Sequence, residues 1–408
     1  MAEVGLWKSV LVILIYVISL NGELICKSRY SILHCEPGKN DYILKRGIVS
    51  DNNDTNSIII KLCRITEVEL ESFANNPRLK VIDLSRNKIK ELKLGVFDGI
   101  KTLTHLKIAH NSLTAIPLGL FDQLPNLKLL HLNDNKITSL ASGILDKLSH
   151  LNHFDLSANG LLGKDLNPSL FDKKPKLKSL LFSRNDMSQS PDELLSGLPA
   201  LTTLELNACS LTTFPKFATK PNLKTLLYLQ LNTNKIEAID DISTFVNLIN
   251  LESLDLKNNR IENITVTVFS SLRNLNFLEM SFNRIQEIPE DLFTSMPNLQ
   301  SMDLSYNFIE YVPLNALLPR SNLRTLKLVS NRISFLESGF FKKLRFSRRA
   351  ILTDFDIAGN PFQCACLLEI IDEMKKYSFR YNSDKYNGKH EVCSMTDEFI
   401  CKRDKLSV

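Results

Sequence analysis

The chain has 408 residues, of which 44% are hydrophobic and 23% are charged, and its formal net charge is +5. This composition is typical of a folded protein with a large hydrophobic core, and it argues against intrinsic disorder. The charge excess is small for a chain of this length and says little about partners. We expect no nucleic-acid partner.

The first predicted element is a secretory signal peptide over residues 1–22. A lysine precedes an apolar run from Ser9 to Leu20, and this run is shorter than the ~20 apolar residues that a membrane helix needs. No comparable run follows, so we expect no stable membrane insertion. The sequence therefore predicts a secreted, extracellular protein, in which the sequons at Asn53 and Asn263 are predicted to carry glycans.

An amino-terminal cap is predicted over residues 23–57, with Cys26 and Cys35 ahead of the first repeat. In the oxidising compartment that a signal peptide implies, disulfides would cover the open end of the hydrophobic core. Cys63 is close to this cap, so a disulfide from Cys63 to Cys26 or Cys35 remains open beside its interpretation as a buried thiol.

Residues 58–360 contain a repeat whose units end in a recurring asparagine or cysteine. Segments such as LKVIDLSRNKI, LTHLKIAHNSL and LKLLHLNDNKI recur at spacings of 24 to 29 residues. The recurring position is occupied by Cys63, Asn87, Asn111, Asn135, Asn159, Asn185, Cys209, Asn234, Asn259, Asn283, Asn307, Asn331 and Asn360. This is the L-x-x-L-x-L-x-x-N/C-x-L signature of leucine-rich repeats, and it predicts about thirteen stacked turns.

The repeat predicts the fold. Each L-x-L segment is expected to form a short strand, and the inward asparagines are expected to bond the backbone of their own and adjacent turns. Because no single turn buries its own apolar face, the turns must stack and both ends need caps. We therefore predict an α/β leucine-rich repeat solenoid, a curved horseshoe with a parallel β-sheet on its concave face and disulfide-stapled end caps. At Cys209 we predict a buried structural thiol.

A cysteine-rich carboxy-terminal cap is predicted over residues 361–408, where Cys364, Cys366, Cys393 and Cys401 follow the last repeat. Their spacing lacks the C-x2-C pairs of zinc knuckles, so disulfides are favoured over a metal site. With the segment NPFQCAC, the repeats resemble the extracellular leucine-rich repeats of Toll-type receptors, Slit, connectin and secreted insect members. The resemblance implies the disulfides Cys364–Cys393 and Cys366–Cys401.

Two departures from that family pattern are present at the caps. The carboxy-terminal flank lacks its usual tryptophan, so Ile371, Met374 or Tyr377 is expected to fill its core. The amino-terminal cap usually has four clustered cysteines, whereas only two precede the first turn here.

The resemblance also implies that the protein binds a protein or glycan partner through its concave face. The side chain between the second and third leucines of each unit, and the third residue of the unit, face outward from the sheet. In turns eight to eleven this surface is aromatic and acidic, and its predicted partner-binding residues are Tyr228, Phe277, Phe282, Tyr306, Asp255, Glu279 and Asp303. An ordinary solvated sheet face is the alternative interpretation.

Histidines form a second candidate group. His105, His110, His131 and His153 are predicted on concave positions of turns three to five, with His131 next to Asp155. We predict that His105, His131 and His153 contribute to partner binding. Such a group would gain charge between about pH 7 and 5, which gives the hypothesis of pH-dependent binding. Metal binding and plainly solvated histidines are the alternatives.

A third candidate is the basic run in the longest turn, which comprises Lys342, Lys343, Arg345, Arg348 and Arg349. It could bind an anionic glycan or membrane surface, although such runs are also common in solvated loops.

No nucleophile motif, phosphate-binding loop or metalloprotease motif interrupts the repeat, and we expect no serine or cysteine nucleophile beside the histidines. The sequence therefore predicts a protein that is not an enzyme and has no cofactor. The resemblance favours recognition in innate immunity or cell-surface signalling. A structural or adhesive matrix component, with self-association, is the competing prediction.

Overall fold

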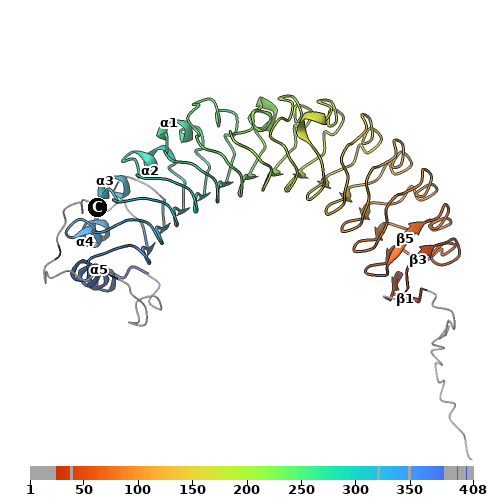
Figure 1. Ribbon diagram of the computed structural model, residues 1–408, viewed down its shortest axis with the longest axis horizontal. Helices are drawn as coiled ribbons and strands as arrows, with labels where there is room; N and C mark the ends of the chain where they lie inside the picture. Colours follow the sequence, from red (N-terminus) through yellow and green to blue (C-terminus); the bar gives the residue numbers. More distant parts are fainter. Residues whose placement is uncertain are drawn as a thin grey trace, which may run out of the picture.

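The computed structural model describes residues 24–36, 40–318, 322–347, 351–380, 393 and 401. The predicted signal peptide, residues 1–22, lies outside the described residues, as does most of the segment 381–408. The repeats stack into an arc in which the strands line the concave side and the helices lie on the convex side (Figure 1).

One sheet runs through the whole arc, in the strand order β1-β2-β4-β6 and then consecutively to β17. Its strands are β1 Cys26–Arg29, β2 Ile32–Cys35, β4 Ser57–Ile59, β6 Val81–Asp83, β7 His105–Lys107, β8 Leu129–His131, β9 His153–Asp155, β10 Ser179–Leu181, β11 Thr203–Glu205, β12 Tyr228–Gln230, β13 Ser253–Asp255, β14 Phe277–Glu279, β15 Ser301–Asp303, β16 Thr325–Lys327 and β17 Asp354–Asp356. The β1–β2 pair is antiparallel, and from β2 onward neighbouring strands are parallel. The predicted solenoid is confirmed.

Outside this sheet, β3 (Tyr42–Leu44) and β5 (Ile65–Val68) form a second parallel pair near the amino-terminal end. Helices are short, and their bounds are η1 Gly163–Asp165, η2 Lys216–Ala218, η3 Pro221–Leu223, α1 Val266–Phe269, α2 Leu292–Ser295, α3 Leu314–Leu317, α4 Phe340–Phe346 and α5 Cys364–Lys376. In the described part of the chain, none of these helices has the length and hydropathy needed to cross a membrane.

Strand β13 shows how one repeat builds its turn. Leu254 and Leu256 are fully buried, whereas Ser253 and Asp255 face outward and are half-buried. The strand begins one residue before the predicted L-x-L segment. Pairing nevertheless continues past its end, because the Leu256 N–H donates to the carbonyl oxygen of Glu279 at 2.8 Å.

A row of large apolar side chains closes the far side of the core. Its members are all buried: Phe97, Phe121, Leu145, Phe171, Leu195, Phe245, Phe269, Phe293, Leu317 and Phe341. Stacking of these side chains from turn to turn removes apolar surface from water that no isolated turn could bury.

The recurring asparagines satisfy the buried backbone between turns. Asn283 Nδ2 donates to the carbonyl oxygens of Leu256 and Met280, each at 3.0 Å, and its Oδ1 accepts the N–H of Ile261 at 3.0 Å. At Cys209 the thiol donates to the carbonyl of Phe182 at 3.5 Å. A thiol offers no amide oxygen, and the Met187 N–H instead bonds the backbone carbonyl of Cys209 at 3.0 Å.

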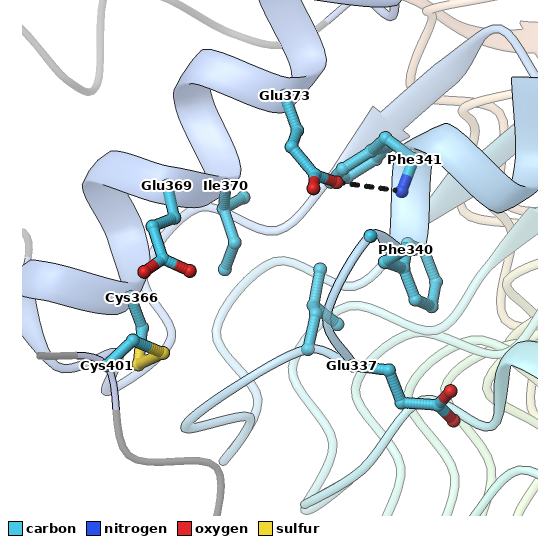
Figure 2. Close-up of a pocket in the computed structure, with 10 residues that line it drawn as sticks. Glu337, Phe340, Phe341, Cys366, Glu369, Ile370, Glu373 and Cys401 are labelled. Atoms are coloured by element: carbon cyan, nitrogen blue, oxygen red, sulfur yellow. Dashed lines mark hydrogen bonds between the residues drawn. A yellow bond between two sulfur atoms is a disulfide. The ribbon is translucent and has the colours of Figure 1, made fainter.

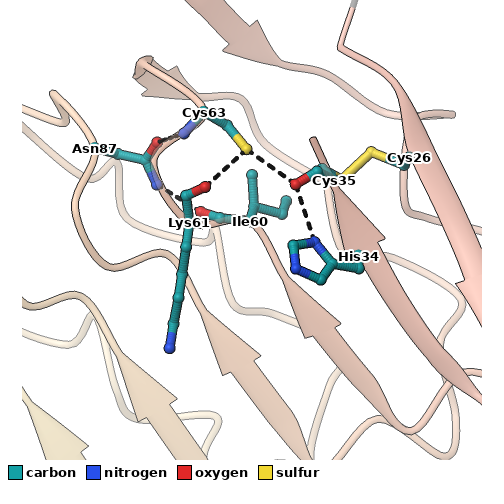
Figure 3. The surroundings of a disulfide bond; sticks show 7 residues. All are labelled: Cys26, His34, Cys35, Ile60, Lys61, Cys63 and Asn87. Carbon is teal, nitrogen blue, oxygen red and sulfur yellow. Dashed lines mark hydrogen bonds between the residues drawn. A yellow bond between two sulfur atoms is a disulfide. The ribbon is translucent and has the colours of Figure 1, made fainter. Parts of the chain in front are cut away.

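The amino-terminal cap contains the disulfide Cys26–Cys35, and Cys63 remains a buried free thiol. Figure 3 shows the Cys63 thiol between two backbone carbonyls, those of Cys35 at 3.3 Å and Lys61 at 3.1 Å. The structure thus resolves the open pairing at this cap.

The carboxy-terminal cap contains Cys364–Cys393 and Cys366–Cys401, the pairs implied by the family resemblance. Helix α5 packs on α4, and Glu373 Oε2 accepts the N–H of Phe341 at 3.2 Å (Figure 2). Met374 is buried, whereas Ile371 and Tyr377 are only partly buried. Of the three expected substitutes for tryptophan, Met374 is therefore the one inside the core.

Candidate functional site

Two exposed aromatic rings stand in one column of the concave sheet. Tyr228 in β12 is 44% exposed and Phe277 in β14 is 54% exposed. Strand register places Ser253 of β13 directly between them, because Tyr228 pairs with Ser253 and Ser253 pairs with Phe277. Alternate residues of a strand face the same side of the sheet, so these side chains share the outward face.

The other two predicted aromatic residues form a stacked pair beyond the strands. The rings of Phe282 and Tyr306 are 4.2 Å apart at an interplanar angle of 11°, and the side chains are 43% and 46% exposed. Both residues have a left-handed backbone conformation, with φ of 56° and 57°. Other residues directly before the recurring asparagine, such as His110, share this conformation. Bulky side chains rarely adopt this backbone, so large aromatic residues here are unusual.

The acidic residues of the concave sheet also form hydrogen bonds within their own turns, which sequence inspection missed. Carboxylate oxygens of Asp255, Glu279 and Asp303 accept the backbone N–H two residues further along, at 2.9 to 3.0 Å. The same bond recurs at Asp155, well outside the aromatic turns. Part of the preference for acids in this column therefore comes from turn capping rather than from partner recognition.

The carboxylates nevertheless crowd one another on the sheet. Burial raises the pKa of Glu279, and the neighbouring Asp303 and Asp255 raise it further, against the Ser281 hydrogen bonds that lower it. The Asp303 carboxylate is partly neutralised by Lys327, whose Nζ lies 3.3 Å away. A positive charge beside Glu279 would relieve the repulsion.

The histidine group is assembled as predicted for three of its members. His105 and His153 lie in one column with Leu129 between them, and His131 lies between Lys107 and Asp155 in the next column. The rings of His131 and His153 are 5.0 Å apart. His110 instead follows β7, where its Nδ1 lies 3.5 Å from Asp134 Oδ2. Strands β10 and β11 separate this group from the aromatic one.

The predicted titration range is wrong for the central histidine. Burial, with a smaller effect of His153, lowers the pKa of His131 to about 4, so this ring stays neutral between pH 7 and 5. Burial also lowers the pKa values of His105 and His153. Nε2 of His131 is buried without a hydrogen-bond partner among the described residues.

In the part of the chain that the structure describes, the histidines form neither a catalytic pair nor a metal cluster. Ser179 is in register with His153 on the neighbouring strand. No hydrogen bond joins these two side chains, both of which are described. Among the described residues, no three His, Cys, Asp or Glu side chains are placed to hold one metal ion.

The remaining candidates lie away from the concave sheet. Lys342, Lys343 and Arg345 are exposed on α4, with Lys343 Nζ 3.6 Å from Glu337 Oε2. The rest of the predicted basic run, Arg348 and Arg349, lies outside the described residues. Both predicted glycan acceptors, Asn53 and Asn263, are exposed.

Three residues near the aromatic rings were not singled out from the sequence. Glu252 Oε2 accepts the Tyr228 hydroxyl at 3.4 Å, and Ser253 separates the two rings. Lys257 Nζ lies 5.3 Å from the centre of the Phe282 ring. The column reads Tyr228, Ser253, Phe277 and Ser301, so large and small residues alternate along it. This alternation is visible in the sequence and could have drawn attention to Ser253.

Comparison with known proteins places this geometry in context. A family model described as "Leucine rich repeat" matches residues 55–113, 101–161, 221–285 and 278–333, together more than half of the chain. No curated protein matches the sequence.

Solved structures share the fold at low sequence identity. A leucine-rich repeat protein of Leptospira interrogans is 22% identical, with a TM-score of 0.60 over 84% of this chain and 94% of that one. The APL1 leucine-rich repeat domain is 19% identical, with a TM-score of 0.60 over 87% and 88%. A chain of the Drosophila Toll–Spatzle complex is 17% identical, with a TM-score of 0.57 over 83% of this chain and 62% of that one.

Proposed function

Because the chain belongs to the leucine-rich repeat family, we propose that it is a secreted, non-enzymatic protein that binds a protein or glycan partner through its concave face. One observation carries the proposal: Tyr228, Phe277, Phe282 and Tyr306 are exposed together on a rigid sheet and its adjoining turns. Exposed aromatic side chains held by a rigid scaffold are typical anchors of binding interfaces.

Recognition in innate immunity or cell-surface signalling is the role that we propose for this binding. Its support is a fold-level analogy, because a chain of the Toll–Spatzle complex, described as a hub in development and innate immunity, shares the solenoid. Extracellular location is supported by three disulfides, which persist in oxidising compartments.

A structural or adhesive role is the second candidate, and a specific apolar feature favours it. Leu70, Leu94 and Leu118 occupy equivalent positions in three successive turns and are 51%, 60% and 59% exposed. Such a ladder of leucines outside the concave sheet could support association between copies of the protein.

Affinity capture from extracellular fluid and microbial surfaces tests the proposal. The variant Tyr228→Ala/Phe277→Ala/Tyr306→Ala removes concave aromatic surface, and Leu70→Ala/Leu94→Ala/Leu118→Ala is the matched control that removes apolar surface elsewhere. We expect a partner, identified by mass spectrometry and then bound in purified form, to be lost only with the aromatic variant. Capture of the protein by itself, lost only with the leucine variant, would contradict recognition and support adhesion.

A further inference from the structure

We propose that the space over Ser253, between Tyr228 and Phe277, is a binding slot for an arginine side chain of a protein partner. The inference rests on the proposed function and deepens it by naming the chemistry that the concave face recognises. Tyr228, Ser253 and Phe277 share one column on three neighbouring strands. Neighbouring strands are ~4.8 Å apart, so the backbones that carry the two rings are about 10 Å apart.

The side chains of Tyr228 and Phe277 form the walls of the slot and Ser253 forms its floor, and they differ greatly in size. Both rings are among the exposed large hydrophobic side chains, whereas the serine between them is small and half-buried. A flat group that enters over Ser253 would therefore lie between the two strands that carry the aromatic rings. Guanidinium groups are planar, are only weakly hydrated, and stack on aromatic faces.

Carboxylates surround the same slot. Glu252 precedes Ser253 and accepts the Tyr228 hydroxyl at 3.4 Å, which places its carboxylate beside one wall. Asp255 lies one outward position further along β13, and Glu279 is next to Asp255 in register. A guanidinium fork can bond such carboxylates while its plane lies between the rings. The charge of the slot is thus complementary to a cation.

Hydrogen bonds within the protein occupy some, but not all, of the acceptor positions of these carboxylates. Asp255 is committed, because its Oδ1 caps the Lys257 N–H and its Oδ2 accepts Asn232 Nδ2 at 2.8 Å. Glu279 uses Oε1 to cap the Ser281 N–H at 3.0 Å, and the Ser281 side chain also bonds its carboxyl group. An ionised carboxylate can accept about four hydrogen bonds, so Glu252 and Glu279 keep acceptor positions for a bound guanidinium.

Cations already contact aromatic rings on neighbouring turns. Lys257, which belongs to the same turn as Ser253, directs its Nζ to the Phe282 ring at 5.3 Å. Arg332 places its guanidinium carbon 4.4 Å from the centre of the Phe308 ring. Tyr228 and Phe277 have no such cation beside them among the described residues. Their rings can therefore form the same cation–π contact with a cation of a partner.

Nonaarginine peptide is the probe for this site, with nonacitrulline as a peptide of matched shape but without charge. Isothermal titration with the full mature protein at physiological salt compares the wild type with Tyr228→Ala/Phe277→Ala and Glu252→Gln/Glu279→Gln. The matched charge control is Glu237→Gln/Asp240→Asn, which removes two exposed carboxylates from outside the slot. Circular dichroism melting checks that each variant is folded.

We expect the Kd for nonaarginine to rise at least tenfold in both slot variants and to change less than twofold in the charge control. Nonacitrulline should bind at least tenfold more weakly than nonaarginine. Equal binding by the wild type and the folded Glu252→Gln/Glu279→Gln variant, or by the two peptides, overturns the proposal. If the slot fails in this way while partner capture still depends on the concave aromatic residues, the proposed function stands. If the slot binds nonaarginine but no partner is captured, the proposed function fails instead.

Discussion

The Cys63 thiol donates to the backbone carbonyl oxygen of Cys35 at 3.3 Å, so this free thiol lies against one half of the Cys26–Cys35 disulfide without joining it. Burial raises the pKa of Cys63 to about 11 and that of Cys209 to about 12, and both side chains are fully buried. The thiolate is the reactive form of cysteine, so both thiols are unreactive in the folded chain.

This relationship predicts the alkylation pattern. The native protein should gain no carbamidomethyl group from iodoacetamide at about pH 8, and after denaturation without reductant it should gain two. Intact mass spectrometry measures both states, and peptide mapping should place the groups on Cys63 and Cys209. Labelling of either residue in the native protein would contradict the buried-thiol assignment, and four labels after denaturation would mean that one of the three disulfides is absent.

Asn283→Ala should destabilise the solenoid strongly. The substitution leaves the carbonyls of Leu256 and Met280 and the N–H of Ile261 without their side-chain partner. Each unsatisfied buried group costs about 1–3 kcal/mol, so we expect a loss of about 2–4 kcal/mol in the free energy of unfolding, after partial relaxation.

Asn276→Ala is the control for that substitution, because its side-chain oxygen accepts only a long contact of 3.5 Å from Gln300. Urea denaturation should show a change of about 0.5 kcal/mol or less for this control. Equal losses for the two variants would refute the structural role assigned to Asn283.

Lys174→Leu should stabilise the protein. Lys174 is 1% exposed and occupies the position that Leu148 and Leu198 fill in other turns, while its Nζ donates to the carbonyl of Lys173 at 2.9 Å. Replacing a buried ammonium by an apolar side chain in a leucine-sized site should gain about 1–3 kcal/mol. The exposed Lys176→Leu is the matched control, and an unchanged or lower stability of Lys174→Leu would show that the lysine is well accommodated.

The same substitution should change the pH dependence of stability. Burial lowers the pKa of Lys174 below its ordinary value of 10.5. Between the lowered and the ordinary pKa the unfolded chain binds more protons, so stability rises with pH across that window. Denaturant midpoints measured up to about pH 10 should show this rise in the wild type and a smaller one in Lys174→Leu.

His131→Gln should improve stability in acid. Because the folded-state pKa of His131 is about 4, below the usual 6.5, the unfolded state binds more protons between these values. Stability therefore falls as the pH drops from 6.5 toward 4, and for this partly solvated ring we expect a contribution of about 1–2 kcal/mol. Urea midpoints of His131→Gln should fall less over this range than those of the wild type and of His150→Gln. Parallel curves for all three proteins would exclude His131 as the group responsible.

Much of the fold was predictable because its information is periodic and local. The asparagines from Asn87 to Asn360 recur at nearly constant spacing, and each bonds its own turn and an adjacent one, so the period alone implies stacked parallel strands. Sequence inspection also placed Tyr228 and Phe277 in one outward column, because alternation along a strand and equal repeat lengths determine both the face and the register.

By itself, then, the sequence determined the repeat, the burial of Cys209 and the residues that share the concave face, since each follows from position within a repeating unit. The tertiary structure decided what depends on distances between turns. Burial by neighbouring turns moved the pKa of His131 out of the expected range. Folding of the cap left Cys63 unpaired beside Cys35. The proposed slot over Ser253 likewise depends on three consecutive strands that bring two large residues and one small residue side by side.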